Sequence, residues 1–236
     1  MYKFDSRIRY SEVDREGKLS LESLLGYFQD CSTFHSEDLG VGLKYLKERH
    51  IAWVLSAWQI VAERYPELGE RVVIGTAPYE FKGFMGYRNF LMETEDGERL
   101  AYANTMWTLM DLKQMKPMKA TPELLEAYKL ETRLDMDYAP RKIALPKAEG
   151  IQQEMVEIKS YHLDTNQHVN NGQYVRIAMK YLPEGYVIRQ MRAEYKKQAR
   201  LGDKILPIIY NEGAVAVASL NNEEGQPYCV VEFQRD

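Results

Sequence analysis

The sequence contains few of the residues that build disulfide-linked or metal-based folds. Among its 236 residues there are two cysteines, Cys31 and Cys229, and four histidines. Two cysteines so far apart in sequence predict neither a disulfide framework nor a zinc site. The histidines are scattered and lack the spacing of metal ligands. A chain of this length can instead bury a workable hydrophobic core, as one large domain or as two smaller ones.

Long apolar runs and an excess of positive charge are also missing. Hydrophobic residues make up 45% of the chain and charged residues 28%, yet no apolar run approaches the roughly 18 to 20 residues that a membrane span needs. The first residues have neither the basic start nor the apolar stretch of a secretory signal. The net charge of −4 argues against general nucleic-acid binding. We therefore expect a globular, cytoplasmic protein with no membrane span.

Polar chemistry is concentrated between residues 164 and 171, which read Asp-Thr-Asn-Gln-His-Val-Asn-Asn. Asp164, Asn166 and His168 are spaced by two, so an extended backbone would turn the three side chains to one side. Asn170 or Asn171 can cap a helix that follows. Free N–H groups at that helix start could hold an oxyanion, as acyl transfer requires. The same Asn-rich composition also suits a turn and cap without chemical duty.

The pattern Asp-x-Asn-x-His-Val-Asn-Asn resembles the signature of the acyl-acyl carrier protein thioesterases, the plant-type fatty acyl-ACP thioesterases and their bacterial relatives. In that family the Asp, Asn and His of this run belong to the active site, which implies catalytic roles for Asp164, Asn166 and His168. A second stretch, residues 193–199, is similar to a strand that reads Glu-Tyr-Arg-Arg-Glu-Cys in the plant-type enzymes. The functional Glu of the family falls on Gln198, and its Cys falls on Ala199.

These residue types can hydrolyse a thioester, and the resemblance implies no metal or organic cofactor. Imidazole titrates near neutral pH, so His168 is the expected base or water-orienting group. Asp164 could orient His168 or assist the attack of water, and Asn166 can both donate and accept hydrogen bonds. Gln198 can hydrogen-bond a water but cannot take its proton. Ala199 excludes a cysteine nucleophile at that position.

Three local matches in the same order indicate an internal repeat. Residues 13–14 match 163–164, residues 68–72 match 201–205, and residues 95–98 match 223–226. The equivalents of Asn166 and His168 in the first half are then Glu16 and Lys18. Only the second half therefore carries the predicted site.

The periodicities predict the same order of elements in both halves. In the first half we expect a strand at 2–12, a helix from Ser20 to about Gly40, a helical piece at 43–49, strands at 51–64, 70–82, 85–95 and 99–112, and a helix opening at Thr121. In the second we expect a strand at 153–162, a helix at 171–182, and strands at 187–199, 203–210, 213–220 and 227–235. One helix must cover one face of each sheet to bury its apolar stripe. This predicts an α+β double hot-dog fold, two repeats that each have a curved antiparallel sheet wrapped around one long helix.

The repeat also predicts a division of labour. We expect an N-terminal hot-dog repeat over residues 1–128 that shapes substrate binding without catalysing, a connector over 129–150, and a catalytic C-terminal hot-dog repeat over 151–236. Bulky residues of the first repeat, such as Trp53, Trp58 and Met85, could line an acyl tunnel or form an ordinary core.

The resemblance implies hydrolysis of fatty acyl-acyl carrier protein to free fatty acid, the step that ends fatty acid synthesis. Two alternatives stay open: an acyl-CoA thioesterase on the same fold, and a non-catalytic acyl-binding protein. The expected partner is acyl carrier protein with a phosphopantetheine-linked acyl chain. A monomer and a homodimer are both allowed. Because carrier proteins are acidic, a basic cluster in the second half could receive one; its members are Arg189, Arg192, Lys196, Lys197, Arg200 and Lys204.

Overall fold

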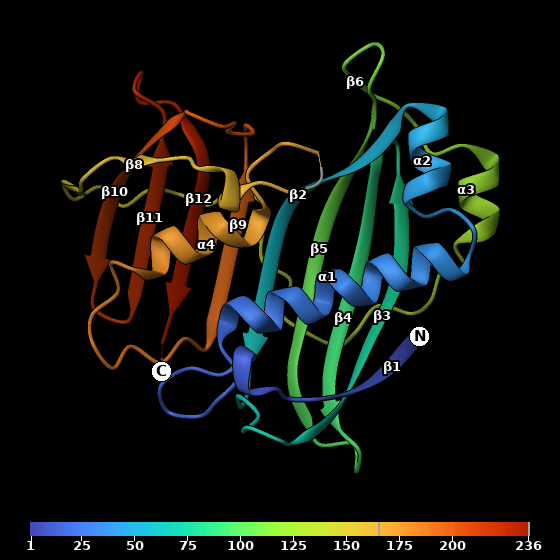
Figure 1. The fold of residues 1–236 in the computed structure, drawn as a ribbon, viewed down its shortest axis with the longest axis horizontal. Coiled ribbons are helices and arrows are strands. Elements are labelled where there is room, and N and C mark those ends of the chain that lie inside the picture. Colours follow the sequence, from blue (N-terminus) through green and yellow to red (C-terminus); the bar gives the residue numbers. More distant parts are fainter. Residues whose placement is uncertain (165, 236) are drawn as a thin grey trace. The chain divides into compact units, whose positions relative to one another are not determined.

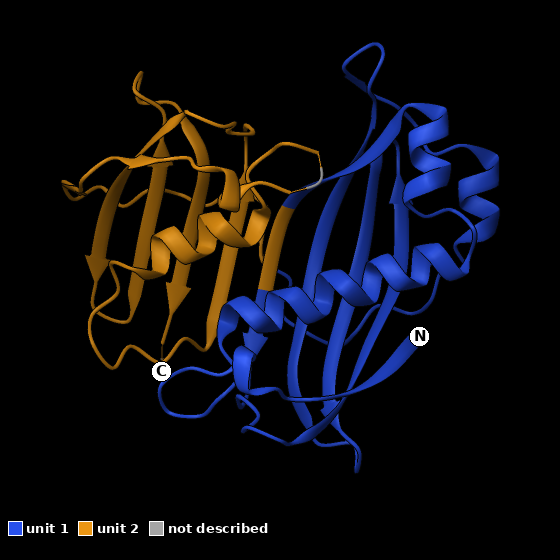
Figure 2. Cartoon of the chain, viewed as in Figure 1, with its two compact units in different colours: residues 1–56, 60–138 blue, residues 57–59, 139–236 orange. Residues whose placement is uncertain are grey.

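The chain divides into two compact units. In the computed structural model, which describes residues 1–164 and 166–235, unit 1 comprises residues 1–56 and 60–138, and unit 2 comprises residues 57–59 and the residues from Ala139 onward (Figure 2). The boundary falls within residues 129–150, which form no helix or strand. Leu134 N–H donates to Asn89 Oδ1 of unit 1 at 3.0 Å, and Ile143 N–H donates to Glu194 Oε2 of unit 2 at 3.2 Å. Each end of this segment is therefore fixed to its own unit.

Unit 1 is an antiparallel sheet with a long helix across one face (Figure 1). The strand order is β1-β3-β4-β5-β2. The strands are β1 (Tyr2–Arg7), β2 (Ile51–Ala62), β3 (Arg71–Lys82), β4 (Met85–Thr94) and β5 (Arg99–Asp111), with a short β6 (Lys116–Pro117) beside β5; the helices are η1 (Tyr10–Glu12), α1 (Leu21–Asp38), α2 (Leu43–Arg49) and α3 (Pro122–Ala127).

Helix α1 forms where its sequence predicts it. The Ser20 hydroxyl oxygen accepts from Ser23 N–H at 3.1 Å and satisfies one of the free donors of the first turn. Its apolar positions recur at helical spacing and are buried against the sheet. Phe28 is fully buried, and its ring lies 5.3 Å from that of Phe90 in β4. Burying an aromatic side chain of this size stabilises the fold by about 1.5–3 kcal/mol.

Unit 2 repeats this arrangement with shorter elements. Its strand order is β7-β10-β11-β12-β9, and β8 also pairs with β10. The elements are β7 (Ile151–Gln152), β8 (Val156–Glu157), η2 (Ser160–His162), α4 (Asn171–Met179), β9 (Gln190–Tyr195), β10 (Lys204–Glu212), β11 (Val215–Asn221) and β12 (Pro227–Gln234). Helix α4 lies across the face of this sheet (Figure 1).

Three predicted elements of unit 2 differ from the structure. The strand expected at 153–162 is wrong, because only β8 and the short helix η2 lie in this stretch, and β7 ends just before it. The neighbouring strand β10 contains Pro207, whose carbonyl accepts from Gln153 N–H at 2.9 Å but which has no N–H to donate in return, and the pairing breaks at this point between β7 and β8. The helix expected at 171–182 ends at Met179, and the strand expected at 187–199 is confined to Gln190–Tyr195. In unit 1, likewise, the strand expected at 2–12 stops at Arg7.

The predicted α+β double hot-dog fold is confirmed, since each unit is an antiparallel sheet around one principal helix. No helix among the described residues is both long and apolar enough to cross a membrane.

Candidate active site

The predicted site lies in a tight turn between η2 and α4. Leu163 and Val169 pair across the base of the turn, and Asp164 N–H donates to the carbonyl of His168 at 2.8 Å. Gln167 adopts the left-handed conformation with φ of 61°. The backbone is therefore folded back on itself, and the expectation that an extended segment aligns Asp164, Asn166 and His168 on one side is wrong.

The carboxylate of Asp164 holds this turn closed. Its Oδ1 accepts the backbone N–H groups of Asn166 at 2.8 Å and of His168 at 3.1 Å. This is the side-chain to backbone pattern that makes Asp frequent at turns. Asp164 is thus engaged with the backbone on which Asn166 and His168 are carried.

Unit 1 contains the same turn without the same side chains. Asp14 N–H donates to the Lys18 carbonyl at 2.8 Å, and Asp14 Oδ1 accepts from Glu16 N–H at 2.8 Å and Lys18 N–H at 3.1 Å. Gly17, with φ of 77°, takes the place of Gln167. The structure therefore confirms that Glu16 and Lys18 are the counterparts of Asn166 and His168.

A second histidine beside the site has a structural role that the sequence did not reveal. His162 is buried, and its Nδ1 accepts from Lys159 N–H at 3.0 Å. The equivalent bond in unit 1 is accepted by Glu12 Oε2 from Arg9 N–H at 2.8 Å. Burial lowers the pKa of His162 below its ordinary value. His162 is thus a neutral acceptor within its turn, and His168 is the candidate for proton transfer.

A single hydrogen bond brings the segment of Gln198 to the turn of His168. Val169 N–H donates to the carbonyl of Ala199 at 3.0 Å, so Gln198 and His168 each immediately precede one partner of this bond. Ala199 N–H donates in turn to the hydroxyl oxygen of Tyr174 in α4 at 2.9 Å. Gln198 and Asn166 are exposed, and His168 is half-buried.

The strand register does not extend to Gln198. Strand β9 ends at Tyr195, and the Lys196 and Lys197 N–H groups both donate to the Tyr228 carbonyl. The strand predicted over 187–199 therefore ends before Gln198, and the nearby carboxylate of the buried Glu194 pairs with Lys196 Nζ at 3.0 Å.

The start of α4 is capped by its own sequence. Asn170 is the N-cap, as predicted, and its Oδ1 accepts from Gly172 N–H at 2.9 Å. Its carbonyl accepts from Gln173 N–H at 2.9 Å. The N–H groups of Gly172 and Gln173, two of those that the helix start was expected to offer to an oxyanion, are therefore already bonded.

The basic cluster is partly neutralised. Ion pairs join Arg192 to Glu232 at 2.9 Å and Lys204 to Glu223 at 3.3 Å, in addition to the Lys196 pair. Lys197 and Arg200 are exposed, as are Lys196 and Lys204. Lys197 and Arg200 flank the segment that carries Gln198.

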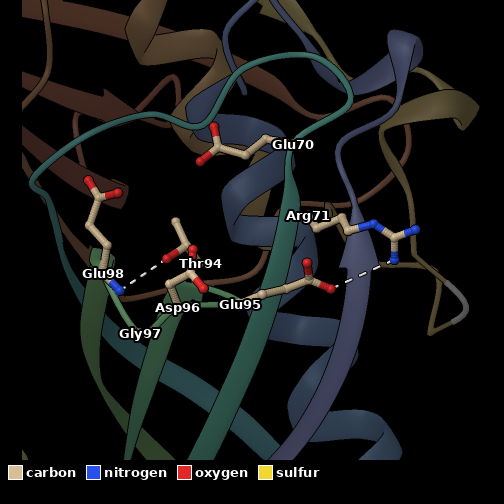
Figure 3. Close-up of a pocket in the computed structure, with 7 residues that line it drawn as sticks. All are labelled: Glu70, Arg71, Thr94, Glu95, Asp96, Gly97 and Glu98. Carbon is tan, nitrogen blue, oxygen red and sulfur yellow. Dashed lines mark hydrogen bonds and ion pairs between the residues drawn. The ribbon is translucent and has the colours of Figure 1, made fainter.

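Unit 1 contains a surface pocket lined by none of the predicted site residues. Figure 3 shows it between the end of β4 and the starts of β3 and β5, lined by Glu70, Arg71, Thr94, Glu95, Asp96, Gly97 and Glu98. Arg64 pairs with Glu70 at 2.8 Å and with Glu98 at 2.9 Å, and its guanidinium lowers the pKa of both carboxyls. The lining is therefore a surface ion-pair network.

Two family models together match most of the chain. The model described as the acyl-ACP thioesterase N-terminal domain matches residues 1–128, and the model of the C-terminal domain matches residues 146–234. The chain belongs to the acyl-ACP thioesterase family. The predicted turn and its helix lie wholly within the second match.

Known members of the acyl-ACP thioesterase family share its sequence and fold. A chloroplastic acyl-[acyl-carrier-protein] hydrolase of Cuphea viscosissima is 26% identical over 209 residues, which are 82% of this chain and 50% of that protein. The chain thus spans about half the length of such curated relatives. The crystal structure of an acyl-ACP thioesterase from Bacteroides thetaiotaomicron superposes with a TM-score of 0.89 at 20% identity, covering 98% of this chain and 96% of the other. The 12:0-ACP thioesterase of Umbellularia californica gives 0.86 at 19% identity, covering 99% and 97%.

Proposed function

We propose that the protein hydrolyses the thioester of fatty acyl-acyl carrier protein to free fatty acid and carrier. The observation that supports this most directly is the turn of unit 2, where His168 and Asn166 stand on a braced backbone joined to the segment of Gln198 by the Val169–Ala199 hydrogen bond. Membership of the acyl-ACP thioesterase family supplies the substrate class.

Each of the four site residues has its own role in this reaction. Gln198 orients a water, and His168 takes its proton as the water oxygen attacks the thioester carbonyl carbon. Asn166 donates its amide N–H to the developing oxyanion. The carbon–sulfur bond then breaks, and the proton held by His168 passes to the departing sulfur of the phosphopantetheine. Asp164 acts through its hydrogen bonds to the backbone of Asn166 and His168.

We assign unit 1 to recognition of the acyl chain. Lys18 and Glu16 cannot reproduce the chemistry of His168 and Asn166, which supports a non-catalytic role for this half. Among the bulky candidates, Trp53 stacks on Phe81 at 5.9 Å, and both pack against the core around Leu109. Replacing Trp53 with Leu should alter preference among acyl lengths more than kcat on the best substrate. A lower melting temperature with an unchanged length profile would leave Trp53 as a core residue only.

The decisive experiment is a hydrolysis assay with matched substrates. Purified protein is given acyl-acyl carrier protein and acyl-CoA with the same acyl chains from 8 to 18 carbons (about the range of common fatty acids), and free thiol is measured. We expect kcat/KM to be higher for the carrier-bound series. Higher values for the CoA series would favour an acyl-CoA thioesterase, and bound acyl thioester that stays intact for hours would favour an acyl-binding protein.

A further inference from the structure

The backbone N–H and the backbone carbonyl of Ala199 are both hydrogen-bonded within unit 2. Its N–H donates to the Tyr174 hydroxyl oxygen at 2.9 Å, and its carbonyl accepts from Val169 N–H at 3.0 Å. Ala199 is fully buried, and Tyr174 is 2% exposed. Water therefore cannot readily replace either bond, and a buried N–H left without its acceptor would destabilise this arrangement.

These bonds end beside the two groups proposed to handle water. Gln198 precedes Ala199 in the chain, and His168 precedes Val169. Two other hydrogen bonds hold this segment. Before Gln198, Lys197 N–H donates to the backbone carbonyl of Tyr228 at 3.2 Å, and two residues after it, Arg200 N–H donates to Asp203 Oδ2 at 2.9 Å. The Tyr174 hydroxyl is thus the nearest side-chain anchor for the backbone that carries Gln198.

Unit 1 lacks this anchor although it keeps the rest of the connection. Leu19 N–H donates to the carbonyl of Pro66 at 2.8 Å, as Val169 N–H does to Ala199. Pro66 has no N–H, however, and the residue in the place of Tyr174, four positions after the N-cap, is Leu24. The hydroxyl-to-peptide bond is therefore not needed to build the turn, since unit 1 builds it without one.

We propose that Tyr174 is a positioning residue whose hydroxyl fixes the Ala199 peptide and thereby sets the distance between Gln198 and His168. The effect on catalysis rests on the proposed function, whereas the effect on His168 does not. Tyr174 does not touch substrate in this proposal. It acts through the peptide that joins the two water-handling side chains.

The test compares Tyr174→Phe with Tyr186→Phe. The Tyr186 hydroxyl also anchors backbone in unit 2, with its one O–H shared between the carbonyls of Ala214 at 2.7 Å and Phe233 at 2.9 Å, and neither carbonyl belongs to the segment of Gln198. Both variants lose one hydroxyl that anchors backbone, that of the buried Tyr174 or of the half-buried Tyr186, so Tyr186→Phe controls for the loss of such an anchor in unit 2. Folding is checked by circular dichroism and melting temperature.

The first measurement does not depend on activity. In NMR spectra, Tyr174→Phe should lose protection of the Ala199 amide from hydrogen exchange and shift the ring signals of His168, while Tyr186→Phe should leave both unchanged. Unchanged His168 signals in a folded Tyr174→Phe protein would overturn the proposal, even if the wild-type protein hydrolysed no thioester.

The second measurement uses kcat with the best acyl-carrier substrate. Tyr174→Phe should lower kcat by about three- to tenfold, no more than the loss expected for Gln198→Ala, with KM changed less than about threefold, because reacting groups are misplaced. In a Gln198→Ala background the same change should have a smaller effect, because the two residues share one route. The proposal would be overturned if Tyr174→Phe kept full kcat or if Tyr186→Phe lost as much. It would also be overturned if the loss in the double variant Tyr174→Phe, Gln198→Ala equalled the product of the two single losses.

Discussion

The two units build the same backbone around different side chains. In both, an Asp carboxylate closes a turn through two N–H groups, and the residue after the turn donates to a carbonyl that follows β2 in unit 1 and β9 in unit 2. The chemistry differs at single positions, with Lys18 against His168 and Leu24 against Tyr174. The turn itself therefore serves folding in both units. Function in this protein has to be sought in what unit 2 adds to it.

The helices differ as much as the site does. Helix α1 has 18 residues, whereas α4 has nine. A long helix with a continuous buried face suits the unit proposed to recognise the acyl chain. The shorter α4 begins at the site and places Tyr174 within its first two turns.

The largest expected difference between the units is the loss of His168. His168→Ala and Asn166→Ala should each lower kcat/KM by at least about 100-fold, as removal of an acid-base or oxyanion group does. Lys18→Ala, at the equivalent position, should stay near wild type. Steady-state kinetics of the folded variants decide this, and a comparable loss in Lys18→Ala would mean that both units act.

Variants of Asp164 and Asp14 should show whether these carboxylates only support their turns or also take part in the reaction. Asp164→Ala removes the acceptor of two N–H groups and should lower kcat by about 10- to 100-fold through misplacement of His168. Asp164→Asn keeps an oxygen in the same place and should restore most of that activity. Asp14→Ala should lower the melting temperature with kcat nearly unchanged. If Asp164→Asn were as inactive as Asp164→Ala, the charge of Asp164 would have a direct part in the reaction.

Gln198 should have a moderate effect that depends on pH. Gln198→Ala should lower kcat/KM by roughly tenfold, because the water loses one hydrogen bond, and Gln198→Glu should retain activity. The carboxylate adds a second ionisation, so the pH profile of Gln198→Glu should gain an acidic limb in which activity falls as that group is protonated. A fully active Gln198→Ala would remove position 198 from the mechanism.

The smallest expected effect concerns docking of the acidic carrier. Lys197→Glu with Arg200→Glu should raise KM for acyl-carrier protein by about three- to tenfold at low salt, since these exposed charges favour encounter. Hydrolysis of a small acyl thioester should be unchanged. Lys113→Glu with Lys119→Glu, on the exposed surface of unit 1, makes the same change in net charge and serves as the control. Equal effects on both substrates would argue against docking at this surface.

Periodicity predicted the regular elements of unit 1 well. Helix α1 and strands β2 to β5 lie close to the ranges that apolar spacing and turn residues predicted. Each of them buries apolar side chains along much of its length, so the hydrophobic pattern follows the element. It failed where side chains bond to backbone. The turn closed by Asp164 and the break opposite Pro207 depend on individual donors and acceptors, which a hydrophobic pattern does not record. The hydrogen bond of Tyr174 could not be predicted either, because its partner, the Ala199 N–H, is 25 residues away in the sequence.

The conformation of Gln167 has an evolutionary consequence. A non-glycine residue at φ of 61° costs about 1–2 kcal/mol, whereas Gly17 takes the same place in unit 1 without that penalty. Glycine at position 167 would lower the free energy of unfolding by roughly 0.4–1 kcal/mol, because the unfolded chain becomes more flexible. This loss is smaller than the strain that glycine removes, so Gln167→Gly should stabilise the fold. The turn that carries His168 is therefore the more strained of the two. Substitution of Gln167 by glycine could raise thermal stability during evolution without changing His168, Asn166 or Gln198.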